Sequence, residues 1–339
     1  MAFISDTNFK NRSLFGKKRG APLLIDPHIV LMITEHQTQR CAKATGRNGN
    51  GHASAHSRIK PEEAFEYPRD FLENRSVYLV ISPRAGGLSI GVNVNPVVNC
   101  NFQCLYCEID CAKPAHTSHF DAEKMAVELR RTYELASSGG LRQLPRYANL
   151  PDNLLQVRHV ALSGDGEPTL SRHFVEALES MVHLRASGVL PFFKIVVVTN
   201  STALDRPEVQ QGLKHLTRED EIWAKLDGGT QAYLNSVNGA TIPLEKIMDN
   251  ILQVARQRPV VIQSPFPAIN GKAPPAREVR QYAQRLKELK KAGAKISLVQ
   301  IYSATRPMAR TGCSHLPLKK LSQIAKTVRQ VAGLQAEVF

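Results

Sequence analysis

Residues 99–107 read Asn99-Cys100-Asn101-Phe102-Gln103-Cys104-Leu105-Tyr106-Cys107, a C-x₃-C-x₂-C pattern. The β-rich run Leu88–Val94 comes just before them, so the cysteines are expected on the loop that follows a strand. Four of the six cysteines of the chain fall between Cys100 and Cys111. In a reducing compartment, such close clustering favours metal ligation over disulfides.

The chain on both sides of this stretch alternates β-rich runs with segments of helical periodicity. Asp121 and Ser171 are expected to cap two of the helices. Six strand–helix repeats predict an α/β fold with a parallel sheet, either open and doubly wound or a partial (β/α)6 barrel. In both arrangements the loops at the C-terminal ends of the strands build the functional site. The six expected strands are Leu88–Val94, Val157–Leu162, Lys194–Thr199, Glu221–Leu226, Val260–Gln263 and Lys295–Tyr302.

Composition limits the class of protein. The 339 residues are 42% hydrophobic and 22% charged, which excludes wholesale disorder and a coil-rich fibre. The longest apolar stretch, Pro22–Ile33, is too short to span a bilayer. We find no secretory signal at the start and therefore expect a cytoplasmic protein with no membrane partner. Residues 1–62, with the polar and Gly-rich Gly46–His56, predict a basic, largely disordered extension, and residues 63–339 form the folded domain.

Three thiolates on one short loop can hold three irons of a [4Fe–4S] cluster and leave the fourth iron open to a ligand from outside the protein. A zinc site is an alternative if Cys111 or His116 supplies the fourth ligand. Cys111 also lies four residues after Cys107, so it is a second candidate ligand of a closed, electron-transferring cluster. These alternatives remain open at the level of the cysteines alone.

A second motif follows the second expected strand: Leu162-Ser163-Gly164-Asp165-Gly166-Glu167-Pro168-Thr169. Its two glycines leave backbone amides open to a close ligand, and Glu167 places a carboxylate beside them. A carboxylate in that position suits a ligand's ammonium group. By itself a Gly-rich turn is a weak signal, but one βα unit after an open-iron cysteine loop it gains weight.

Together the two motifs resemble the radical S-adenosylmethionine superfamily. The wider context, residues 87–93, 163–170 and 225–230, is similar to a branch described as iron–sulfur oxidoreductases related to the radical domain of the wybutosine tRNA synthase. The resemblance covers roughly residues 69–329 and implies a partial (β/α)6 TIM-like barrel with parallel strands. It also implies two cofactors, a [4Fe–4S] cluster and S-adenosylmethionine.

The resemblance assigns roles to individual residues. Cys100, Cys104 and Cys107 would ligate the cluster, and Tyr106 would lie against the adenine of S-adenosylmethionine. Gly166 and Glu167 match the last two positions of the family's Gly-Gly-Glu motif and would hold the methionine ammonium group; Asp165 stands where the family has its first glycine. The remaining expected contacts, with the ribose or the methionine carboxylate, are Thr199, Asn200, Ser201 and Lys225. No catalytic residue is assigned.

The implied activity is reductive cleavage of S-adenosylmethionine to a 5′-deoxyadenosyl radical, which abstracts hydrogen from a substrate. An external electron donor such as flavodoxin or ferredoxin is an implied partner. Residues 271–339 contain 14 Lys/Arg and three Asp/Glu, which makes RNA a candidate substrate. Arg306, Arg310 and Cys313 are further candidate substrate contacts. The alternatives are an activating enzyme for a glycyl-radical protein and an electron carrier in which Cys111 closes the cluster.

Overall fold

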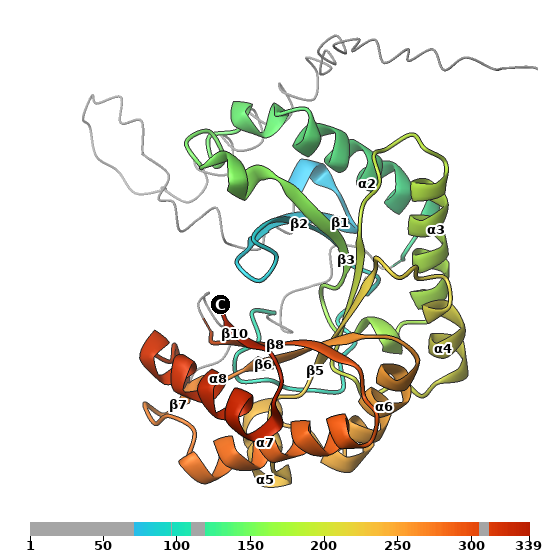
Figure 1. Cartoon of the computed structure of the whole chain (residues 1–339). Coiled ribbons are helices and arrows are strands. Elements are labelled where there is room, and N and C mark those ends of the chain that lie inside the picture. Colours follow the sequence, from blue (N-terminus) through green and yellow to red (C-terminus); the bar gives the residue numbers. More distant parts are fainter. Residues whose placement is uncertain (1–70, 96, 110–118, 305–311) are drawn as a thin grey trace, which may run out of the picture.

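The computed structural model describes residues 71–95, 97–109, 119–304 and 312–339 (Figure 1). The predicted extension of residues 1–62 therefore lies outside the described residues, as do Cys111, His116, Arg306 and Arg310. Within the described part of the chain, no helix is long and apolar enough to cross a membrane.

The six predicted strands all form, as neighbours in one parallel sheet. Each is a run of mostly apolar, often β-branched residues that packs well on a pleated surface. The sheet curls into a half-barrel, so the prediction of a partial barrel is confirmed over the doubly wound alternative (Figure 1). The strands are β2 (Gly87–Val92), β3 (Val157–Leu162), β4 (Ile195–Thr199), β5 (Glu221–Lys225), β6 (Val260–Pro265) and β8 (Ile296–Tyr302).

Two further strands extend this sheet at its edges. β1 (Val77–Ser82) pairs antiparallel with β2, and β10 (Ala336–Val338) pairs parallel with β8. The sheet order is β1-β2-β3-β4-β5-β6-β8-β10, in which β1 and β10 are the edges. The chain thus enters the barrel through a β-hairpin rather than directly through a βα unit. A separate two-stranded ribbon pairs β7 (Ala268–Ile269) with β9 (Cys313–Ser314).

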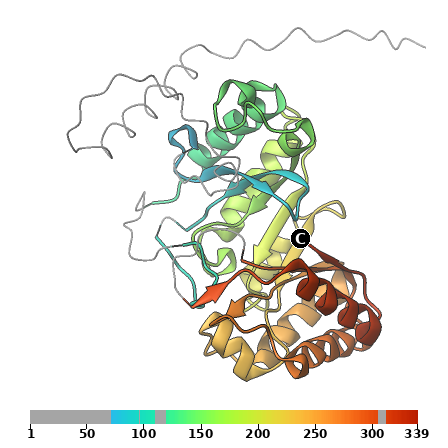
Figure 2. The same ribbon diagram turned by 90° about the vertical axis from the view of Figure 1, so that its left-hand side faces the viewer.

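Helices cover the outer face of the curled sheet (Figures 1 and 2). The Asp121 cap is confirmed, because its carboxylate accepts a hydrogen bond from the Lys124 amide at 3.0 Å. Ser171 does not cap the next helix; its hydroxyl donates to the Val94 carbonyl at 2.9 Å. The helices are α2 (Ala122–Ser137), α3 (Phe174–Ala186), α4 (Pro207–Leu213), α5 (Gln231–Asn238), α6 (Leu244–Gln257), α7 (Ala276–Lys291) and α8 (Leu318–Ala332), with 3₁₀ turns η2 (Phe71–Glu73), η3 (Gly140–Gln143), η4 (Asp152–Leu155) and η5 (Pro168–Leu170).

Alternation along the strands separates two apolar cores. In β5, Ile222 and Ala224 belong to the large core, whereas Trp223 belongs to a smaller cluster with residues such as Ala161 and Val196. Since side chains alternate between the two faces of a strand, Lys225 shares the face of Trp223. The strand therefore directs Lys225 to the inside of the barrel, at its C-terminal end.

The barrel interior has room for an aromatic ring only because one strand residue is a glycine. Tyr78 of β1 pairs with Gly91 of β2, and a β-carbon on Gly91 would lie 1.9 Å from the Tyr78 ring. The Tyr78 hydroxyl lies 2.7 Å from the Ser163 Oγ, at the end of β3. Glycine at position 91 thus lets the tyrosine lie across the strand toward the functional end of the sheet.

His159 on β3 is a buried group whose protonation opposes folding. Its Nε2 lies 2.8 Å from the Ser89 Oγ, and its ring makes an edge contact with Trp223 at 5.1 Å between centroids. Burial lowers the pKa of His159 to about 4, so the ring is neutral in the folded protein at neutral pH.

We expect acid to destabilise the protein through His159. Between about pH 6.5 and pH 4 the unfolded chain binds a proton at this residue that the folded chain does not, so stability falls as pH falls, by about 3 kcal/mol in total. Urea unfolding of the wild type and of His159→Gln across this range measures the difference. Equal pH slopes for the two proteins would contradict the expectation.

Candidate functional site: the cysteine pocket

Backbone hydrogen bonds hold the cysteine loop on two sides, although it has no regular secondary structure. The amides of Gln103 and Leu105 donate to the carbonyls of Asn238 and Val237, at the end of α5, at 2.7 and 2.8 Å. On the other side, the Glu167 amide donates to the Asn99 carbonyl at 2.8 Å. These bonds satisfy main-chain groups that would otherwise be exposed, and they fix the loop between β3 and α5.

Close approach of two backbones makes the second of these contacts possible. A β-carbon on Gly166 would lie 2.3 Å from the Asn99 carbonyl oxygen, and Gly166 has a φ of +132°. Any other residue would therefore be strained in conformation and would push the cysteine loop away. Asp165, which replaces the family's first glycine, is buried in this turn, and its amide donates to the Asn93 Oδ1 at 3.2 Å.

The three cysteines face one pocket, at the C-terminal ends of the strands. Of the ten predicted site residues, nine line it and only Ser201 does not. The Ser201 side chain is buried and donates to the Lys225 carbonyl at 3.2 Å. The nine are Cys100, Cys104, Tyr106, Cys107, Gly166, Glu167, Thr199, Asn200 and Lys225.

Glu167 ties the turn after β3 to the end of β4. Its carboxylate accepts hydrogen bonds from the Thr169 amide and hydroxyl at 3.1 and 2.6 Å, the Thr199 hydroxyl at 2.6 Å and the Asn200 amide at 2.5 Å. Burial raises the pKa of Glu167, and these hydrogen bonds oppose that rise. Three of the four bonds reach Oε1, so Oε2 keeps the greater capacity to accept from a ligand.

A polar cluster that sequence reasoning missed lies behind Cys104. The Asn238 amide group lies 3.0 Å from the Cys104 Sγ and 2.7 Å from the Asp227 Oδ2. The Tyr106 hydroxyl donates to the same Asp227 oxygen. Hydrogen bonds to a ligating sulfur adjust the potential of iron–sulfur clusters, so Asn238 is placed to influence any metal bound at Cys104.

Lys225 enters the pocket from the inner face of β5. Its ammonium nitrogen lies 4.5 Å from the centre of the Tyr106 ring and 3.4 Å from the Tyr302 hydroxyl. Burial by itself would lower the pKa of Lys225, but Tyr302 and Asp227 outweigh it and raise the pKa. Lys225 is therefore a fixed positive charge beside the cysteines.

The cysteines are mutual neighbours, and without metal they are protonated. Desolvation is the largest cause that raises the pKa of Cys100 to about 12, and the Cys104 and Cys107 thiols raise it further. Desolvation likewise raises the pKa of Cys104. Metal ligation must therefore expel protons from these thiols.

In the parts of the chain that the structure describes, no three His, Cys, Asp or Glu side chains converge as ligands of a single ion do. A cubane makes a different demand, because each of its cysteines binds a different iron. Cys313, on β9, directs its thiol at the Leu105 carbonyl, 3.2 Å away, and so borders the cysteine loop.

Comparisons with known proteins support this site's setting. No family model matches the chain. The UPF0026 protein slr1464 of Synechocystis is 28% identical over 52% of this chain and 58% of its own length, so this chain spans little more than half of that relative. A UPF0026 protein of Helicobacter pylori is 26% identical over 66% of each chain.

A solved radical SAM methyltransferase from Sphaerobacter thermophilus matches with a TM-score of 0.52, at 15% identity, over 78% of this chain and 68% of that one. The chain has a radical SAM fold. The resemblance drawn from the sequence is therefore confirmed at the level of the fold. Archaeal TYW1 matches with a TM-score of 0.46 at 13% identity, over 78% of this chain and 85% of that one, which is too low to support a closer relationship.

The Glu167→Gln variant tests the link between the two strand ends. We expect a loss of about 1–3 kcal/mol in the free energy of unfolding, because a carboxamide nitrogen must face donors that now bond to oxygen. Urea unfolding of the metal-free chain measures it. The matched control is Glu245→Gln on an exposed position of α6, for which we expect a change within about 0.5 kcal/mol. Equal effects of the two variants would contradict the structural role of Glu167.

Proposed function

We propose that this protein is a radical S-adenosylmethionine enzyme. Cys100, Cys104 and Cys107 would hold a [4Fe–4S] cluster in the cysteine pocket. The observation that carries the proposal is that these three thiols, spaced C-x₃-C-x₂-C, line one pocket together with Glu167 and Lys225, on a radical SAM fold. The donor set fits the group: soft sulfur ligands for iron, with polar groups beside them for an amino acid.

When bound, the cluster and S-adenosylmethionine supply a one-electron reductive cleavage and a 5′-deoxyadenosyl radical that abstracts hydrogen. An electron donor such as flavodoxin or ferredoxin would deliver that electron. The chain's own residues bind and orient: Glu167 and the Gly166 backbone offer acceptors for an ammonium group, and Lys225 offers a positive charge to a carboxylate. Asn238 holds the Cys104 sulfur, and the apolar cluster around Trp223 closes the barrel beneath the pocket to water.

Anaerobic reconstitution tests the proposal. We expect the wild type to bind iron and sulfide and, after reduction with dithionite, to convert S-adenosylmethionine to 5′-deoxyadenosine, measured by mass spectrometry. Serine at Cys100, Cys104 or Cys107 should abolish the cluster, because an alcohol is a poor ligand for iron. The matched control is Cys313→Ser, a cysteine that borders the same loop.

Several outcomes would overturn the proposal. If the reconstituted wild type holds iron and sulfide but never forms 5′-deoxyadenosine, the radical function is wrong. If Cys111→Ala loses the cluster, the protein is instead a closed electron carrier. If Cys111→Ala keeps both the cluster and the cleavage, the electron-carrier alternative fails.

RNA is the substrate class that the surface charge favours. On α7 and α8, Lys290, Lys291, Lys319, Lys320 and Lys326 are all exposed. Such a surface attracts phosphate backbones, with an affinity that falls as salt rises.

We expect Lys319→Gln with Lys320→Gln to weaken binding of tRNA and to flatten its salt dependence by about two phosphate contacts. Fluorescence anisotropy over a range of salt concentrations measures both. The control pair is Lys124→Gln with Arg130→Gln, which removes two exposed charges from α2. Unchanged affinity and slope in the α8 variant would remove the physical support for RNA.

A further inference from the structure

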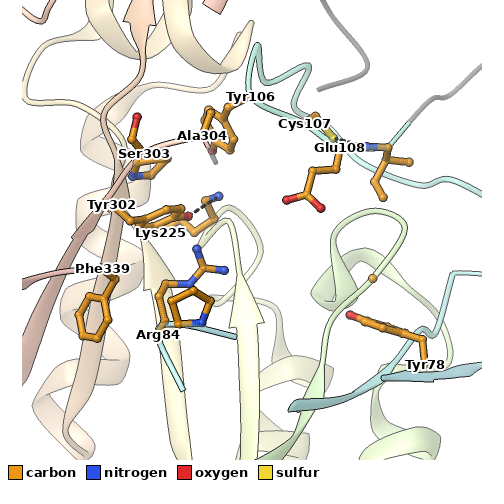
Figure 3. A pocket seen from close by; sticks show the side chains of 14 residues that line it. Tyr78, Arg84, Tyr106, Cys107, Glu108, Lys225, Tyr302, Ser303, Ala304 and Phe339 are labelled. Carbon is orange, nitrogen blue, oxygen red and sulfur yellow. Dashed lines mark hydrogen bonds between the residues drawn. The ribbon is translucent and has the colours of Figure 1, made fainter. Parts of the chain in front are cut away.

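A second pocket lies inside the barrel, beside the cysteine pocket (Figure 3). It is lined by the β1–β2 hairpin, by the cysteine loop and by the ends of β5 and β8. We call it the inner chamber and define it by Tyr78, Arg84, Tyr106, Cys107, Lys225 and Tyr302. Tyr106, Cys107 and Lys225 line both pockets, so a compound in the inner chamber lies next to the cysteines.

Arg84 is the feature of the inner chamber that the proposed function does not use. It lies in the turn between β1 and β2, where the amides of Ala85 and Gly86 both donate to the Ser82 carbonyl at 3.0 Å. These bonds fix the backbone from which the arginine extends. Its guanidinium carbon lies 4.1 Å from the centre of the Tyr302 ring, as in a cation–π contact, and points into the chamber (Figure 3).

Arg84 has no carboxylate partner within the residues that the structure describes. Its Nε is buried and makes no hydrogen bond in that same part of the chain. A guanidinium presents five N–H donors in a fork that matches the oxygens of a carboxylate or phosphate. An arginine held by a ring on one face, with its donors unused, is ready to bind such a group.

A second cation strengthens the positive charge of the chamber. Lys225 lies 3.4 Å from the hydroxyl of Tyr302, and the ring of the same tyrosine carries Arg84. Two like charges around one ring repel each other, and an anion between them would relieve that repulsion. The acidic Glu108 lies on the opposite wall and is exposed to solvent (Figure 3).

We propose that the inner chamber is the substrate pocket and that Arg84, stacked on Tyr302, binds a carboxylate or phosphate group of the substrate. To call the ligand a substrate rests on the proposed radical function, but the anion site itself does not. The aromatic walls formed by Tyr78, Tyr106 and Tyr302 favour a substrate with a planar, apolar part next to the anionic group.

Binding of two small probes tests the proposal. Phenyl phosphate and benzoate share an aromatic ring and differ in the anion, so together they distinguish a phosphate from a carboxylate site. Isothermal titration of the full chain, both reconstituted and metal-free, measures their affinities. We expect at least one probe to bind at millimolar concentration or below, and Arg84→Met to weaken that binding at least tenfold.

Matched variants separate binding from structure. Arg158→Met removes an exposed arginine that donates to the Gly86 carbonyl of the same hairpin at 3.0 Å, and we expect probe affinity to stay within twofold of the wild type. Arg84→Lys, which keeps the charge and loses the fork, should recover part of the phosphate affinity. Urea unfolding of each variant checks that the chain is folded.

Three results would overturn the inference: no binding of either probe to the wild type at tens of millimolar, unchanged affinity in Arg84→Met, or an equal loss in Arg158→Met. The radical function fails separately, through the absence of 5′-deoxyadenosine from reconstituted wild type. Probe binding that depends on Arg84 in the metal-free chain supports the anion site even in that case.

Discussion

The backbone contact between Gly166 and Asn99 is the constraint on which the site depends. The cysteine loop carries three metal-binding side chains but no helix or strand of its own, so its neighbours must fix its position. The Glu167 amide anchors it at Asn99, and the Glu167 carboxylate carries the same anchor on to Thr199 and Asn200. Position 166 has to be a glycine, since a β-carbon would meet the Asn99 oxygen at 2.3 Å. A single turn thus connects the loop to two parallel strands.

The alternation of the strands determines what else reaches the site. Because Lys225 lies on the same face of β5 as Trp223, one strand supplies both the apolar floor of the barrel and a charge above it. Tyr302, at the end of β8, is close to Lys225 through its hydroxyl and to Arg84 through its ring. The hairpin of β1 and β2 is what brings Arg84 to that ring. The additional edge strand therefore contributes to the inner chamber as well as to the sheet.

Much of this arrangement was predictable from local sequence. The six central strands are Val- and Ile-rich runs bounded by turn residues, and the cysteine spacing points to its pocket directly. β1 escaped prediction because a strand rather than a helix follows it, so the βα pattern did not include it. Asp227 and Asn238 were missed for another reason: Asn238 meets Cys104 across 134 positions of sequence, and next to Gly239 it looks like the end of a helix. Only the folded chain brings that amide to the sulfur.

Charge divides the interior into two regions with different preferences. Asp227 is buried behind Tyr106, where Tyr106 and Asn238 bond its Oδ2, so its negative charge is held away from the inner chamber. Lys225 and Arg84 face the chamber without a carboxylate partner among the described residues. A buried anion behind the ring and cations in front of it create a field that draws negative groups toward the cysteines. The same Asp227 helps to keep Lys225 charged, because it raises the pKa of that lysine against the effect of burial. The polar cluster that holds Cys104 and the cationic chamber are therefore one electrostatic unit, and loss of Asp227 would disturb both.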